Sequence, residues 1–150
     1  MSDPVLSRNM YVSKQLRLPL TMMTRFTDAY IDGSQKKPKI KFLSYSTHDW
    51  TVAQMLLFLD AEYEKFEVLP YASQLKLELH STDGCKSEDC FWVEVIYNGR
   101  LLSFEDECQD ESRCSYPEFM QLIQFRGFVN TKTFYEHECA KKWHKDSNSI

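Results

Sequence analysis

The stretch from Lys39 to Asp60 constrains the fold most, because it joins one apolar run directly to another. Ile40 to Tyr45 reads as a short buried strand, and the nearly unbroken apolar run that begins at Thr51 predicts a helix. Between them stand small hydroxyl residues and the pair His48-Asp49. In open α/β sheets ligands collect beyond the carboxyl ends of strands, and the first N–H groups of a helix favour an anion. The sequence therefore predicts an anion-binding site at this strand-to-helix junction.

Regular periods on both sides of this stretch predict an α/β fold. Before it, apolar residues recur with a helical period from Leu18 to Ile31, and Gly33 offers a C-cap, whereas residues 1–17 show no clear period. After it, a period of two predicts strands joined in an antiparallel meander, with an Asn98-Gly99 hairpin turn. The elements expected there are strands at Leu75–Leu79, Phe91–Tyr97 and Arg100–Phe104, then a helix that starts at a Ser115–Glu118 capping box and ends at Gly127.

The composition excludes several classes of function. The 150 residues are 43% hydrophobic, which predicts a single globular domain over residues 1–150. With only four glycines, the chain has neither a GxGxxG nor a GxxxxGK[ST] nucleotide loop. The net charge of −4 argues against a nucleic acid partner. The apolar run Met55 to Leu59 is too short to span a membrane, and the first residues lack the pattern of a signal peptide.

Five cysteines suggest disulfides and an oxidising compartment. Cys85 and Cys90 flank one polar loop, Cys108 and Cys114 flank another, and Cys139 stands alone. Zinc is the weaker interpretation, because neither pair has the two-residue gap common in tetrahedral sites, and no metal site is predicted. The odd cysteine suggests a partner outside this chain.

The pair His48-Asp49 has a structural and a functional interpretation. In the structural interpretation, Asp49 caps the helix and His48 is a hydrogen-bonded residue at the end of the strand. Because His-Asp dipeptides are unspecific, the pair taken alone favours this interpretation. Two ionisable groups at a helix N-terminus also form a plausible anion-binding and acid–base site. No serine or cysteine pairs convincingly with a base as a nucleophile. The histidines expected to take no part in chemistry are His80, His137 and His144.

The order of motifs resembles the C-terminal part of the histidine acid phosphatases, most closely the prostatic and lysosomal type. The resemblance rests on Ser44-Tyr45-Ser46-Thr47-His48-Asp49-x-Thr51, a helix, Leu69-Pro70-Tyr71-Ala72-Ser73 and a strand hairpin. It continues through Phe91–Tyr97, Cys108…Cys114-x-Tyr-Pro-Glu-x-Phe119 and Cys139, and covers about Leu18 to Trp143. It implies part of a three-layer α/β core: helix, strand and helix, then an antiparallel edge meander and a C-terminal helix.

The resemblance also implies a reaction. Members of this family hydrolyse phosphomonoesters without a cofactor, through a phosphohistidine formed on an Arg-His-Gly-x-Arg-x-Pro motif. Asp49 then corresponds to the proton donor for the leaving alcohol, and His48 to a phosphate ligand. Such a general acid contributes about 10²–10⁴-fold to the rate.

This sequence departs from the family pattern in three respects, one of which is Gln74, at a position where animal members commonly have a disulfide cysteine. It has no Arg-His-Gly, so the nucleophile is expected in an N-terminal half of the same enzyme, and the chain alone is expected to be inactive. Trp50 stands where the family usually has a small residue, which makes Trp50 and Thr51 candidates for the substrate pocket. The resemblance further implies a partner for Cys139 in the other half, a lysosomal or secreted location and a possible homodimer of the complete enzyme. The alternative is a non-catalytic relic, or a phosphate-binding or interaction module.

Overall fold

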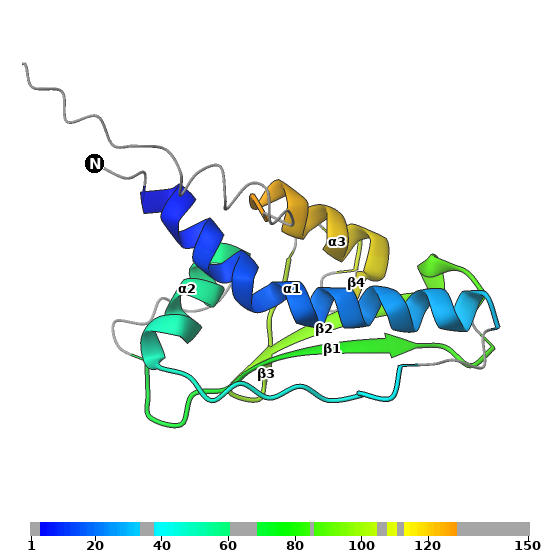
Figure 1. The fold of residues 1–150 in the computed structure, drawn as a ribbon, viewed down its shortest axis with the longest axis horizontal. Helices are drawn as coiled ribbons and strands as arrows, with labels where there is room; N and C mark the ends of the chain where they lie inside the picture. The colour runs from blue at the N-terminus through cyan, green and yellow to red at the C-terminus, as the bar shows by residue number, and fades with distance from the viewer. Residues whose placement is uncertain are drawn as a thin grey trace, which may run out of the picture.

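The fold is mixed α/β, with helices packed against a small antiparallel sheet (Figure 1). The computed structural model describes residues 4–33, 38–60, 69–84, 86–104, 108–110 and 113–128. Within these ranges the helices are α1 (Pro4–Ile31), α2 (Asp49–Leu59) and α3 (Tyr116–Phe125), with a short 3₁₀ turn, η1 (Glu88–Cys90). The strands are β1 (Leu75–Ser81), β2 (Phe91–Tyr97), β3 (Arg100–Leu101) and β4 (Cys114–Ser115).

Helix α1 begins at Pro4 rather than at the predicted Leu18, so the expectation of no regular structure in residues 1–17 is wrong from Pro4 onward. A buried stripe at Val12, Leu16, Leu20 and Met23 runs along the middle of the helix and continues on both sides of the predicted start at Leu18. Buried polar residues interrupt its first part, and this hid the helical period. The C-terminal half of α1 runs along the β1–β2 hairpin (Figure 1), where the Tyr30 and Phe91 rings meet edge to face with centroids 6.0 Å apart.

The predicted meander is confirmed, with β2 at its centre. β1 pairs with β2 in antiparallel register from Leu75↔Tyr97 to Ser81↔Phe91, and β3 follows through the Asn98-Gly99 turn. β3 has only two residues instead of extending to Phe104, because Leu102 and Phe104 turn into the core. The short strand β4 also pairs with β2 and was not predicted, since two residues cannot display a period.

The expected strand at Ile40–Tyr45 is not formed. The segment is extended, but it joins no ladder within the described part of the chain. Its large side chains are open to solvent, with Ile40 52%, Phe42 82% and Tyr45 50% exposed. A strand exists only where a neighbour accepts and donates its backbone hydrogen bonds, and an apolar run cannot reveal whether that neighbour is present. The prediction of a buried strand leading into α2 is therefore wrong for this structure.

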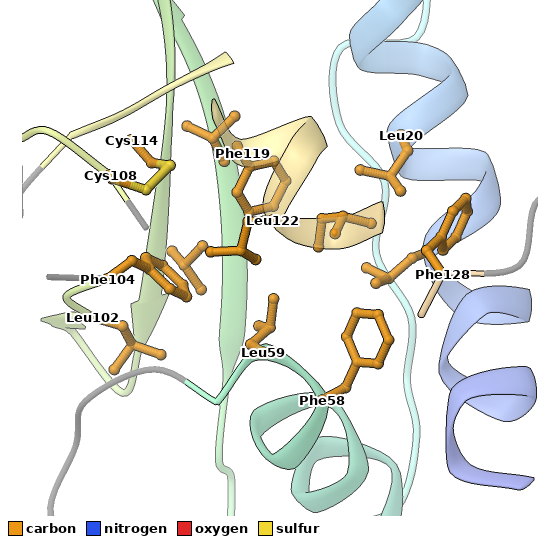
Figure 2. Close-up of a cluster of buried hydrophobic side chains, with 14 of the residues drawn as sticks. Leu20, Phe58, Leu59, Leu102, Phe104, Cys108, Cys114, Phe119, Leu122 and Phe128 are labelled. Atoms are coloured by element: carbon orange, nitrogen blue, oxygen red, sulfur yellow. A yellow bond between two sulfur atoms is a disulfide. The ribbon is translucent and has the colours of Figure 1, made fainter. Parts of the chain in front are cut away.

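A single core unites the helices and the sheet. Alternate residues of β2 point inward and meet side chains from α1, α2 and α3 (Figure 2). The Ser115–Glu118 capping box predicted for α3 is present, with Glu118 N donating to Ser115 Oγ at 3.4 Å. It fixes the start of α3, whose Phe119 and Ile123 are completely buried.

The predicted disulfide between Cys108 and Cys114 is confirmed, and both cysteines are buried beside this core (Figure 2). Cys90 is disulfide-bonded as well, but its predicted partner Cys85 lies outside the described residues. The prediction for Cys139 lies outside them too. A search of the described helices finds none with the length and apolar character needed to cross a membrane.

Candidate functional site

His48 and Asp49 lie at the start of α2, and both side chains are exposed. His48 occupies the N-cap position with an extended backbone, φ −97° and ψ 161°, and its side chain caps no N–H group. Asp49 is the first helical residue, and its Oδ1 accepts a hydrogen bond from Trp50 N at 2.7 Å. Asp49 is therefore not the N-cap that the structural interpretation of this pair required.

Backbone bonds hold the first turn of α2 in place. Thr51 N and Val52 N both donate to His48 O, at 3.0 and 3.4 Å. The aligned peptide dipoles of this 11-residue helix place a partial positive charge beside the two exposed side chains. The arrangement can attract an anion and offers one carboxyl group and one imidazole to it.

A chain of hydroxyl groups anchors this junction to α1. Thr47 Oγ1 donates to Thr51 Oγ1 at 2.6 Å, and Thr51 Oγ1 lies 2.8 Å from the Tyr11 hydroxyl. Thr51 is only 6% exposed, so its side chain belongs to the buried contact between α2 and α1. Trp50, its neighbour in the sequence, is 64% exposed. Tyr11 was not predicted from the sequence, because it lies in the part of α1 whose sequence shows no clear helical period.

Two described arginines make contacts away from this junction. Arg126 Nη1 binds Asp60 Oδ2 at 3.2 Å, at the opposite end of α2, and the Arg113 guanidinium lies 5.2 Å from the centre of the Trp92 ring. A phosphate at His48 would thus meet an imidazole and a helix N-terminus, without a clamp from either of these arginines. Such a clamp would have to come from elsewhere.

The junction lies open to solvent, because His48, Asp49 and Trp50 are all exposed. A groove of about 540 Å³ lies between α1 and the segment Pro38–Ile40. Its lining residues on α1 run from Met22 to Asp32, whereas the hydroxyl chain reaches α1 at Tyr11, several turns away. The groove therefore does not belong to the His48-Asp49 site.

Comparison with protein-family models, curated proteins and solved structures gives no match to this chain.

Proposed function

We propose that this chain supplies the proton-donor half of an acid phosphatase active site, and that the complete enzyme is a histidine acid phosphatase of the prostatic and lysosomal type. The observation that carries the proposal is the exposed His48-Asp49 pair at the N-terminus of α2. The family is proposed from the order of the motifs around this pair, which resembles that of the histidine acid phosphatases. His48 binds the phosphate of a phosphomonoester, and Asp49 protonates the departing alcohol.

The hydrogen bonding of Asp49 leaves one of its oxygens for proton transfer. Its Oδ1 already accepts the Trp50 N–H, so Oδ2 is the oxygen available to carry a proton outward. The nucleophilic histidine of the other half attacks phosphorus, the P–O ester bond breaks, and this proton neutralises the leaving alkoxide. Water then attacks the phosphohistidine and releases inorganic phosphate, while the Asp49 carboxylate accepts the proton of that water.

The exposed segment Ile40–Tyr45 supports a second half of the enzyme. In the proposed whole it is a strand of the three-layer core, paired and covered by the N-terminal part that carries Arg-His-Gly. Covering Phe42 would contribute up to about 1.5–3 kcal/mol, and Ile40 and Tyr45, which are already half covered, about half as much each. The same half would supply the phosphate-clamping arginines and a partner for Cys139.

Location and substrate size follow from the same proposal. The Cys108–Cys114 disulfide supports folding in an oxidising compartment, and we assign the complete enzyme to the lysosome or to secretion, where it could form a homodimer. Trp50 stands exposed next to the proton donor. There it would narrow the leaving-group side of the site and favour small or flat alcohols.

Phosphate binding by the isolated chain tests the proposal directly. We expect no turnover of p-nitrophenyl phosphate, but we expect inorganic phosphate to shift the NMR signals of the His48 ring and of the first turn of α2. His48→Ala should abolish the shifts at the first turn, whereas the matched control His80→Ala should leave them unchanged. Turnover by the isolated chain that disappears in Asp49→Asn would contradict the half-site.

The same titration separates the alternatives. If His48→Ala does not change phosphate binding, the chain is a plain interaction domain. If phosphate binds at His48 but an added Arg-His-Gly half never produces turnover, the chain is a non-catalytic phosphate-binding module.

A further inference from the structure

A cluster of three metal-ligand side chains lies on the β1–β2 hairpin, apart from the residues used above. Glu78 and His80 alternate along β1 and so share one face, and the register places Glu78 directly opposite Glu94. One ligand atom from each of the three residues lies within 4.8 Å of the other two. All three side chains are half-buried.

The two glutamates place like charges opposite each other, and the Lys76 ammonium pairs with only one of them, Glu78. Like charges directly opposite each other on antiparallel strands destabilise the sheet. Each carboxylate nevertheless turns one oxygen toward the same atom: Glu78 Oε2 and Glu94 Oε2 lie 3.3 and 3.6 Å from His80 Nε2. This convergence suggests that a positive charge belongs between the three groups.

The remaining oxygens of the two carboxylates are held by other partners. Glu78 Oε1 pairs with Lys76 Nζ at 3.2 Å, and Glu94 Oε1 accepts a hydrogen bond from Trp92 Nε1 at 3.0 Å. Outer contacts of this kind orient metal ligands in proteins. They leave one free oxygen on each glutamate, directed at the histidine.

The imidazole is held in position and its inner nitrogen is shielded. The His80 ring stacks on Trp92 with centroids 5.4 Å apart and an interplanar angle of 11°. His80 Nε2 is buried from solvent and has no hydrogen-bond partner among the described residues. A buried ring nitrogen that faces two carboxylate oxygens can be a protonated donor or a metal ligand.

The spacing fits a metal ion held between the three groups. Two ligands at about 2.1 Å from a tetrahedral zinc ion stand about 3.4 Å apart. The observed separations of 3.3 and 3.6 Å match this value, although they also lie within the range of an ion pair between a protonated histidine and a carboxylate. We propose that Glu78, His80 and Glu94 bind a divalent first-row metal ion such as Zn²⁺, which ties β1 to β2, with water in the remaining position.

This inference does not depend on the proposed phosphatase activity. It departs from the sequence-based expectation that His80 takes no part in chemistry and that the chain has no metal site. The signal available in the sequence was Glu78-x-His80, two ligands on one face of a predicted strand. The third ligand, Glu94, requires the strand register and could not be read from spacing alone.

Zinc titration of EDTA-treated protein tests the site. We use a Cys139→Ser background, to remove a competing thiol, and measure binding by calorimetry. We expect one Zn²⁺ ion per chain, affinity at least 10-fold weaker in His80→Asn and Glu94→Gln, and unchanged affinity in the control His48→Asn. Absence of zinc binding, or equal binding by His80→Asn, would overturn the proposal.

Thermal unfolding separates a metal site from a salt bridge of protonated His80. Glu94→Gln removes one of the two opposed carboxylates, so in EDTA it should unfold at the same temperature as the parent or at a higher one. Added zinc should raise the unfolding temperature of the parent but not that of Glu94→Gln. A different result would contradict the metal site: Glu94→Gln unfolds at a lower temperature than the parent in EDTA, and zinc does not raise the unfolding temperature of the parent. In that case a protonated histidine bridges the two glutamates.

Discussion

Replacing Gly127 with alanine should loosen the contact between the end of α3 and the start of α1. Gly127 follows α3 with φ +86°, a conformation that costs an L side chain about 1–2 kcal/mol. An added Cβ would also lie 2.5 Å from Asn9 Nδ2, which donates to Arg126 O at 3.0 Å. The Asn9 side chain would have to move and lose this hydrogen bond, at about 0.5–1.5 kcal/mol. We therefore expect a total loss of about 1.5–3.5 kcal/mol.

Gly99→Ala provides the matched control, because Gly99 also has a positive φ, +83°, but nothing lies within 4 Å of an added Cβ. It should cost only the backbone term, about 1–2 kcal/mol. Asn9→Ala should cost only the hydrogen bond, and the double variant Asn9→Ala/Gly127→Ala should be no less stable than Gly127→Ala alone. Urea unfolding of the parent and the four variants gives the free energies of unfolding to be compared. Additive losses in the double variant would refute the contact between Asn9 and Gly127.

Two further predictions concern the core. Cys108→Ala/Cys114→Ala opens a loop with a sequence separation of 6, and loop entropy predicts a loss of about 2 kcal/mol, measurable by urea unfolding of the parent and the variant without reductant. Burial raises the pKa of Tyr116 above its ordinary value of 10.0, partly offset by the hydrogen bond with Thr24. Because the folded state favours the protonated phenol, stability should fall as the pH rises above 10.0, and Tyr116→Phe should flatten that fall in pH-dependent unfolding.

Local signals in the sequence predicted the hairpin and α3 well. The strand Phe91–Tyr97 has the predicted bounds, because alternating aromatic and β-branched residues identify a half-buried strand without further context. The Asn98-Gly99 turn and the Ser115–Glu118 box were equally readable, because each depends on neighbours in the sequence. These elements were predictable because their determinants are local.

Features that depend on residues far away in the sequence could not be predicted. Ile40–Tyr45 has the composition of a strand, but pairing needs a second strand that composition does not show. The pairing of β4 with β2 depends on the long-range register, as does the place of Glu94 opposite Glu78. The position of His48-Asp49 at the start of a helix was predicted, whereas the hydroxyl chain to Tyr11 beneath it required the tertiary structure.

Turnover by a reconstituted enzyme tests the assignment of Asp49 most directly. The chain is combined with the N-terminal half of a histidine acid phosphatase that carries Arg-His-Gly, and kcat is measured for an alkyl phosphate and for p-nitrophenyl phosphate. We expect Asp49→Asn to lower kcat by about 10²–10⁴-fold for the alkyl ester, whose alkoxide needs a proton, and much less for the nitrophenyl ester. Equal rates for parent and Asp49→Asn on the alkyl ester would contradict the role of Asp49 as the proton donor.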